Sequence, residues 1–439
     1  MQHVLALQFK RKRGYNTPVM KILFILECAN CLTNGTSATC LRFAEELRKK
    51  GHECKVLGCY FENQQDPAWY VGFDHFKFPV FEALIHKEGF NFVKVDPAKI
   101  YEEVKTADVV HLFLPFKFSN VARLIAQYIG VPVTAAFHMQ PQNVTSAIHM
   151  GQVGFVNDVL YGSFRRYLYR HVKHIHCPSQ MIADQLISHK YSMCVPHVIS
   201  NGINEYFHPI KAERPKELEG KYIVTMSGRL AREKRQDLII RAIAESPYNE
   251  KIQLILCGQG PEKDRYLALA KKVKLANMPI IGFQSQESLR NILNYTDLYV
   301  HASDFEIEGI SCIEAFACGA VPVVSDSKLS ATRSFALDPQ CIFKHGQYKS
   351  LKHRINYFIE HPERKEELSK QYIELAPKYA LPIMVDRFEE MLKEAIEDKK
   401  NGQDLPTLRP SKTDRIKAKK IFRALKRNGI IEEIPENLR

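Results

Sequence analysis

The stretch EIEGISCIEAFACGAVPVV, residues 306–324, joins a charged turn, a short helix and a buried strand. Glu306 lies on the polar approach to a helix that starts at about Gly309, and Glu314 lies about one and a half turns inside it. Gly319 is placed to cap the helix, and the apolar run that follows predicts a buried strand. A helix followed at once by a buried strand is typical of a parallel α/β sheet.

The same alternation extends outward from this stretch. Apolar runs such as KILFIL (21–26), KYIVTMSGRL (221–230) and DLYVHAS (297–303) are followed by polar turns and helical patterns. Continuous apolar strands between helices indicate parallel sheets covered on both faces. The alternation pauses at residues 197–215, which hold an Asn-Gly turn signal and two prolines. This pause predicts a boundary between two domains.

We therefore predict an α/β protein with two Rossmann-like, doubly wound domains that face each other across a cleft, followed by C-terminal helices. The predicted divisions are an N-terminal extension (1–19), a first domain (20–197), a second domain (198–385), and a return helix with a basic tail helix (386–439). Ligands bind at the carboxyl ends of the strands in such sheets, so the turns after the strands are where chemistry is expected.

Composition and charge limit the possible binding partners and the cellular compartment of the protein. The 439 residues carry a net charge of +13, and the segment from Arg409 to Arg427 alone holds nine basic residues and one acid, Asp414. Such a segment attracts anions, and its sign does not choose among lipid head groups, nucleic acid and acidic substrates. The charged opening residues do not suit a signal peptide, so we expect a cytosolic protein. Eleven irregularly spaced cysteines favour reduced thiols, and Cys28-x-x-Cys31 lacks the second half of a zinc site.

Three turns that end strands carry candidate site residues. Gly35 opens a helix where a small residue lets a backbone amide approach a phosphate, although a glycine there is more often simple turn chemistry. His138 ends the run VPVTAAFH and is either a cleft group or a satisfied polar residue. Gly228, Arg229 and Lys234 directly follow a strand. Acidic residues are normally preferred at the start of a helix, so two cations there indicate a bound anion such as a diphosphate. The alternative is a charged helix start that simply faces solvent.

Three motifs in this order resemble the GT-B glycosyltransferases, specifically the retaining nucleotide-sugar enzymes of family 4. ISNGINEYFHP (199–209) resembles the linker signature of that family, and SGRLAREKRQDLIIRA (227–242) resembles its arginine-and-lysine phosphate motif. The opening stretch (306–324) resembles its paired-glutamate motif. The resemblance covers roughly residues 20–345.

The resemblance implies a role for each candidate. Arg229 and Lys234 would neutralise the donor diphosphate, Glu306 would lie by the donor sugar, and His138 would touch the sugar near the reacting carbon; these four carry the implied catalytic roles. Glu314 would hold the ribose. The other implied donor contacts are the glycines Gly35 and Gly228, the amides of Gly309, Ile310 and Ser311 near the phosphates, and Phe283 and Gln284 near the base.

The resemblance also implies the reaction. The anomeric configuration is retained, a front-face mechanism lets the departing diphosphate take the acceptor proton, and no metal or other cofactor is expected. The chain has no Asp-x-Asp sequence, which fits that expectation. A UDP-sugar is the commonest donor in the family. Ile307 and Glu308 depart from the usual pattern after the first glutamate, and Glu308 adds a negative charge near an anionic donor.

The expected acceptor is a hydroxyl of a glycolipid or cell-envelope glycan, and nucleic acid is not an expected partner. Residues 154–176 mix an apolar helical stripe with basic residues. Together with the tail they predict either peripheral contact with the inner face of an anionic membrane or a packed helix with a tail docked on the first domain. A GT-B sugar-nucleotide epimerase and a non-catalytic polyanion-binding protein are the alternative functions.

Overall fold

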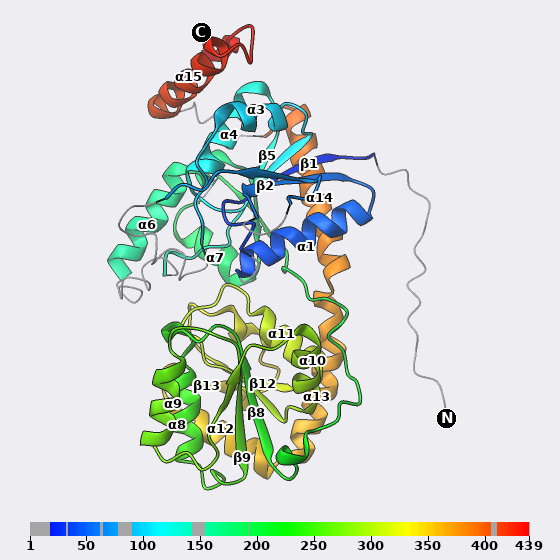
Figure 1. Cartoon of the computed structure of the whole chain (residues 1–439), viewed down its shortest axis with the longest axis vertical. Helices are drawn as coiled ribbons and strands as arrows, with labels where there is room; N and C mark the ends of the chain where they lie inside the picture. Colours follow the sequence, from blue (N-terminus) through cyan, green and yellow to red (C-terminus); the bar gives the residue numbers. More distant parts are fainter. Residues whose placement is uncertain are drawn as a thin grey trace.

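The computed structural model describes residues 18–31, 34–61, 65–77, 90–142, 154–191, 193–404 and 411–438. Strands and helices alternate along these residues and build two lobes, each around one parallel sheet (Figure 1). Residues 1–17 of the predicted N-terminal extension lie outside the described residues. All eleven cysteines are free thiols, as predicted.

Seven strands form the sheet of the first lobe within the described residues, in the order β3-β2-β1-β4-β5-β6-β7. They are β1 (Lys21–Ile25), β2 (Glu53–Cys59), β3 (Tyr70–Phe73), β4 (Val109–Leu112), β5 (Val133–Ala136), β6 (His174–Cys177) and β7 (Val195–Val198). The helices of this lobe are α1 (Gly35–Lys49), α3 (Pro97–Val104), α4 (Lys117–Ile129), α6 (Gly154–Tyr167) and α7 (Gln180–Ser188). The central strands are buried along most of their length, His111 and Thr134 included, because helices cover both faces of the sheet.

The second lobe repeats this plan with six described strands in the order β10-β9-β8-β11-β12-β13. They are β8 (Tyr222–Ser227), β9 (Ile252–Cys257), β10 (Ile280–Gly282), β11 (Leu298–His301), β12 (Val321–Ser325) and β13 (Ile342–Phe343). The helices are α8 (Gln236–Ala244), α9 (Lys263–Lys272), α10 (Gln286–Tyr295), α11 (Ile310–Ala317), α12 (Tyr348–Glu360) and α13 (Pro362–Leu375). The strand of the opening stretch and one face of its helix are apolar and buried, as expected for the centre of a covered sheet.

Both sheets reverse their strand order beside their first strand. The reversal lies between β1 and β4 in the first sheet and between β8 and β11 in the second. Loops at such a switch point diverge to opposite faces of the sheet and leave a crevice for ligands. The loops after β8 and β11 are therefore the place where the second lobe is expected to bind its ligand.

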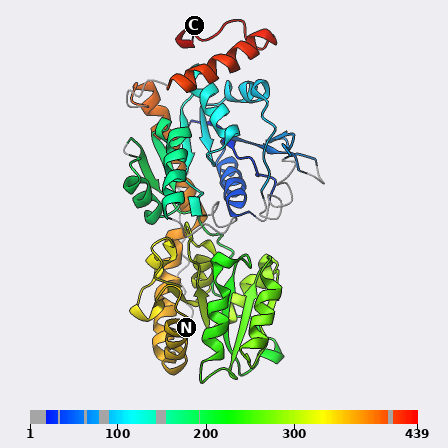
Figure 2. The same ribbon diagram turned by 90° about the vertical axis from the view of Figure 1, so that its left-hand side faces the viewer.

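One long helix, α14 (Leu381–Lys400), returns from the second lobe to the first (Figures 1 and 2). Its residues Met384, Val385 and Phe388 belong to the hydrophobic core of the first lobe. The helix begins at Leu381, five residues before the predicted division at 386, because its first turn already packs on the first lobe.

The basic tail helix, α15 (Lys412–Arg427), docks on α3 and α4 of the first lobe. Its buried apolar residues are Ala418, Phe422 and Leu425. Asp414 is buried with them and lies 3.4 Å from the Arg123 guanidinium and 3.0 Å from His171 Nε2. The tail thus docks on the first lobe, while most of the basic side chains of the helix stay exposed and contact with a membrane stays a prediction. None of the helices within the described ranges is long and apolar enough to cross a membrane.

Candidate active site

A buried ion pair joins the loop after β8 to the loop after β11. Lys234 Nζ lies 2.5 Å from Glu306 Oε2, and the two side chains are only 20% and 16% exposed. His301, the last residue of β11, places its Nε2 3.4 Å from the same carboxylate oxygen. Burial would raise the pKa of Glu306, but Lys234 and His301 hold this pKa far below its usual range. Glu306 is therefore ionised at neutral pH.

Arg229 and Lys234 belong to one turn that follows β8. Burial lowers the pKa of Lys234, Glu306 raises it above its ordinary value, and the positive charge of Arg229 opposes the rise. Arg229 therefore lies close enough to act on Lys234. A Cβ added to Gly258, after β9, would lie 2.0 Å from the carbonyl oxygen of Gly228. Glycine at 258 thus allows the neighbouring loop to pack against the turn that carries both cations.

Helix α11 begins in the same loop region. Its first residue, Ile310, follows Gly309, whose φ of 92° favours glycine, and Gly309 offers no side-chain cap. Backbone amides at the start of this helix therefore lie at its positive end. The Tyr299 hydroxyl donates to Ser311 Oγ at 3.0 Å and accepts from the Ser227 amide at 3.3 Å. This buried tyrosine links the start of α11 to the end of β8.

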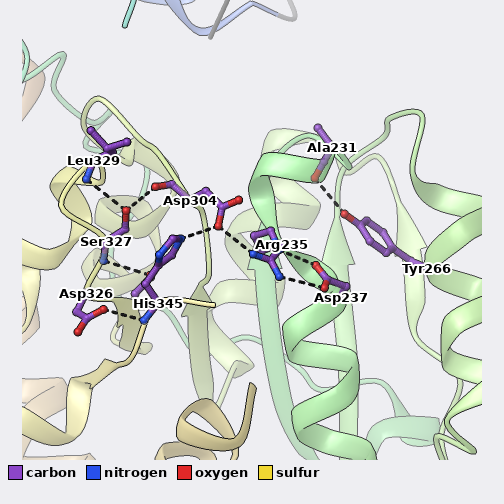
Figure 3. Close-up of polar contacts among 10 residues, drawn as sticks. Ala231, Arg235, Asp237, Tyr266, Asp304, Asp326, Ser327, Leu329 and His345 are labelled. Atoms are coloured by element: carbon purple, nitrogen blue, oxygen red, sulfur yellow. Dashed lines mark hydrogen bonds and ion pairs between the residues drawn. The ribbon is translucent and has the colours of Figure 1, made fainter. Parts of the chain in front are cut away.

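Further contacts brace the loops that carry the ion pair, and Figure 3 shows them. The Asp304 carboxylate accepts hydrogen bonds from Arg235 at 3.1 Å and from His345 at 2.8 Å. The Asp304 carbonyl oxygen accepts a hydrogen bond of 2.5 Å from the Ser327 hydroxyl, in the loop after β12. Arg235 directly follows the lysine of the ion pair, and Asp304 lies two residues before the glutamate. One aspartate thus holds three strand-ending loops in register.

Glu308 is bound to the linker between the lobes. Its carboxylate accepts hydrogen bonds from the Ser200 hydroxyl and from the Asn201 amide, the latter at 3.0 Å. Burial raises the pKa of Glu308 to about 7, and these hydrogen bonds together with Arg42 limit the rise. The residue that departs from the family pattern therefore has a structural partner and is not an unpaired negative charge.

Glu314 faces a cation of the other lobe. It is half-buried on α11, and burial raises its pKa to about 7 while Arg42 of α1 opposes the rise. Burial also lowers the pKa of Arg42, which the charges of Glu314 and Glu308 partly restore. Glu314 is therefore not an exposed surface charge.

The first lobe approaches the ion pair through the loop after β5. His138 is buried there, and neither of its ring nitrogens has a hydrogen-bond partner within the described parts of the chain. Burial and the neighbouring His176 hold the pKa of His138 well below its usual range, so the ring is neutral. Two residues on, Gln140 Nε2 lies 3.5 Å from the Leu329 carbonyl oxygen, which accepts the Glu306 amide at 3.0 Å. The loop of His138 therefore contacts the loop after β12, which is itself bound to the backbone of Glu306.

Gly35 is the first residue of α1 and is exposed. The Asn34 side chain caps this helix by accepting a hydrogen bond of 2.9 Å from the Thr36 amide. A Cβ added to Gly35 would meet nothing within 4 Å, so packing inside the protein does not require glycine there.

The predicted base contacts follow β10 and lie apart from the ion pair. Phe283 is 68% exposed, and the Gln284 side chain accepts a hydrogen bond of 2.6 Å from the Ser288 hydroxyl. Gln284 and α10 line a cavity of about 490 Å³, to which neither Lys234 nor Glu306 contributes. This cavity is therefore separate from the charged site.

The structure thus brings the phosphate-motif cations, the first glutamate and the start of α11 together, and it places the loop of His138 beside them. Residues that the sequence analysis did not select complete the arrangement: Arg42, Tyr299, His301 and Asp304. His301 ends a predicted strand, so the rule that selected His138 would also have found it. No local pattern distinguishes Arg42 from other helix surface residues.

Sequence comparison places both lobes in known families. The model for "Glycosyltransferase Family 4" matches residues 33–206, and the model for "Glycosyl transferases group 1" matches residues 209–375. The two models together match most of the chain. The structure adds two doubly wound lobes and a charged site at the second switch point, and these features define the class of protein. The chain belongs to the group 1, family 4 glycosyltransferases of the GT-B fold.

Individual relatives agree with this assignment. The alpha-monoglucosyldiacylglycerol synthase of Streptococcus pneumoniae is 23% identical over 66% of this chain and 68% of that protein. The GDP-mannose-dependent alpha-mannosyltransferase of Mycolicibacterium smegmatis is 22% identical over 70% of this chain and 79% of that protein. Anabaena HepE, solved with UDP-glucose, is 16% identical and covers 85% of this chain and all of its own, with a TM-score of 0.65, which shows the common fold. The protein is therefore a glycosyltransferase, and neither an epimerase nor a polyanion-binding protein is favoured.

Proposed function

We propose that the protein transfers a sugar from a nucleotide-sugar donor to a hydroxyl of a glycolipid or cell-envelope glycan, with retention of the anomeric configuration and without a metal. A UDP-sugar is the first donor to test, because a structural neighbour was solved with UDP-glucose, whereas a sequence relative is named for GDP-mannose. The observation that carries the proposal is the partly buried cluster of Lys234, Arg229 and Glu306 beside the open start of α11.

This cluster suits departure of a nucleoside diphosphate. Negative charge grows on the leaving phosphate oxygen in the transition state, and preorganised cations in a partly buried site lower the barrier there. Lys234 and Arg229 supply two cations, and the amides of Ile310 and Ser311 at the helix start supply hydrogen-bond donors. Glu306, kept ionised by Lys234, would face the positive charge that develops on the donor sugar.

The remaining residues fit the rest of the donor. The Glu314 carboxyl group makes no hydrogen bond to the described residues, and as a carboxylate it can accept two hydrogen bonds from a ribose diol. The exposed Phe283 and the neighbouring Gln284 would meet the base, and Gly35 leaves room for the diphosphate on the side of the first lobe. His138, held neutral by burial, can donate one hydrogen bond and accept another at a sugar hydroxyl.

A front-face reaction fits this set of groups. The departing diphosphate oxygen would take the proton of the acceptor hydroxyl while the acceptor oxygen bonds to the anomeric carbon on the same face. The proton then needs no side-chain base, and the neutral His138 would orient the sugar instead of carrying the proton.

A lipid acceptor is supported by the names of two relatives and by one surface. The relative from Acholeplasma laidlawii, 23% identical over 70% of this chain, is also named alpha-monoglucosyldiacylglycerol synthase. Helix α6 exposes Phe155 (77%) and Val159 (55%), and Arg166 is exposed near its end. Lys417 of the tail helix lies 5.2 Å from the ring centroid of Tyr167, the last residue of α6. We propose that this apolar and basic face lies on an anionic membrane.

The test combines donor binding with product analysis. Thermal stabilisation by UDP, GDP, ADP and CMP and their sugars, with a chelator present, identifies the donor, and transfer to lipid acceptors follows with that donor. Arg232→Ala is the matched control, because Arg232 lies in the same turn but its guanidinium contacts Glu262 at 3.3 Å. We expect the α-anomer from an α-linked donor, and loss of turnover in Lys234→Ala but not in the control. An inverted product, or a strict requirement for Mg²⁺, would overturn the proposed mechanism.

A further inference from the structure

Imidazole and carboxylate groups meet where α14 crosses the edge of the first sheet. His174 is the first residue of β6, His197 lies on β7, and Glu394 projects from α14. The first residue of a parallel strand lies at the sheet edge opposite the carboxyl ends, where the donor site is expected. This cluster is therefore outside the machinery described above.

The spacing of the three potential ligand atoms suits one small cation. His174 Nδ1 and His197 Nε2 lie 2.9 Å apart, and His197 Nε2 lies 3.7 Å from Glu394 Oε2. One ligand atom from each of the three residues falls within 4.8 Å of the others. Ligand atoms of a tetrahedral zinc ion, with bonds of about 2.0–2.1 Å, lie roughly 3.3 Å apart. The observed separations bracket that value, so small side-chain rotations would complete the geometry.

A second carboxylate orients the buried histidine. His174 Nε2 donates to Asp398 Oδ2 at 2.8 Å, and Asp398 is itself held by the Lys173 ammonium. With its proton on Nε2, the neutral ring presents the lone pair of Nδ1 towards His197. Histidine ligands of metal ions almost always donate their other ring N–H to a carboxylate, carbonyl or water in this way.

We propose that His174, His197 and Glu394 form a binding site for a divalent transition-metal ion, with zinc as the expected occupant. Two imidazole nitrogens and one carboxylate oxygen favour zinc and its neighbours over magnesium and calcium, which prefer all-oxygen sites. The Glu394 side chain is 59% exposed, which leaves the fourth position to water. The metal would fasten the end of the helix that connects the two lobes to the edge of the first sheet.

The site is tested on the full-length protein after removal of metals with a chelator. Titration with ZnCl₂ in a calorimeter is expected to show saturable binding of one ion and a rise in Tm, and MgCl₂ is expected to give neither. His197→Ala should abolish this binding, and Asp398→Asn should weaken it by about 10–100-fold. His353→Ala, an exposed histidine of α12 in the other lobe, is the matched control and should bind as the wild type does.

Two further measurements keep the outcome unambiguous. Glu394→Gln changes a largely exposed side chain, so it tests the ligand set even if His197→Ala does not fold. Cobalt(II) can be bound in place of zinc, and its visible absorption spectrum is then recorded. Intense visible absorption is expected if the bound cobalt is tetrahedral. Absence of saturable zinc binding, or equal binding by the wild type and both ligand variants, would overturn the proposal and leave a histidine pair held only by hydrogen bonds.

Discussion

Replacing Lys234 by alanine is expected to cause two losses that can be separated. The first is a loss of stability, because Glu306 keeps its burial but loses its principal partner, 2.5 Å away. Removing one member of a buried ion pair costs about 3–5 kcal/mol. For a lobe of this size, about 3 kcal/mol lowers Tm by roughly 6–12 °C. The depressed pKa of Glu306 places this contribution at neutral pH, and it disappears as the pH falls below about 4.5 towards the folded pKa.

The second loss is in turnover. If Lys234 stabilises charge on the leaving diphosphate, its removal is expected to lower kcat by about 10²–10³-fold, or about 2.7–4 kcal/mol of transition-state stabilisation. Donor affinity should fall less, because Arg229 and the start of α11 remain to bind the ground-state phosphates. Steady-state and single-turnover rates at saturating donor, with the donor Kd measured separately, distinguish these effects.

A double variant separates the folding effect from the catalytic effect. Lys234→Met combined with Glu306→Gln removes both charges and leaves no unpaired buried ion, so most of the lost Tm should return. Activity should not return, because the cation is still missing. Recovery of turnover together with stability would refute the reasoning, since Lys234 would then serve only to neutralise Glu306. Wild-type kcat in Lys234→Ala would refute it more directly.

Burial raises the pKa of Glu314 to about 7, so this side chain loses its negative charge as the pH falls below about 7. Nucleotide affinity, measured by calorimetry, is therefore expected to weaken over the same pH range. Glu314→Gln should bind the nucleotide weakly at every pH. Asp304→Asn weakens the carboxylate contacts with Arg235 and His345, and kcat is expected to fall by about 10–100-fold while Tm changes little. Asp414→Asn should lower the free energy of unfolding by ~2 kcal/mol above pH 3.8, and this difference should vanish as the pH falls through the folded pKa of about 2. At neutral pH, protease should release the tail helix faster from the variant than from the wild type. Phe155→Ser is expected to weaken sedimentation with anionic vesicles by about tenfold.

The fold was predictable because its main signals are local. Each strand lies between covering helices, so its apolar run appears directly in the sequence, and the turn residues mark where it ends. The charged motif of residues 227–242 and the opening stretch each lie within one βα unit, so spacing along the chain also gives spacing in the structure. The sequence therefore predicted the class of fold and the edge of the sheet where the candidate site lies.

Contacts between distant parts of the chain were not predictable in this way. In the tail helix the large apolar Ile416 is 50% exposed, while the smaller Ala418 is buried. The reason is the contact of Asp414 with a buried arginine and histidine of the first lobe, which fixes the rotation of the helix. Periodicity alone does not reveal a partner almost 300 positions away.

The three glutamates of the opening stretch show why residue type alone does not define a role. All three are withdrawn from water, yet Lys234 keeps Glu306 ionised, while burial raises the pKa of Glu308 and of Glu314 to about 7. Glu308 has its acceptor capacity used by the linker, so it is poorly suited to bind a ligand. Among the described residues, Arg42 is the charge that opposes the effect of burial on Glu314, and no hydrogen bond occupies its oxygens, so they are available to a diol whose hydroxyls would offset the cost of ionising it. Neighbours from other loops and from the other lobe thus give three nearby glutamates different roles. Glu306 is the carboxylate of an ion pair, Glu308 is a structural hydrogen-bond acceptor, and Glu314 is the proposed ligand of the ribose.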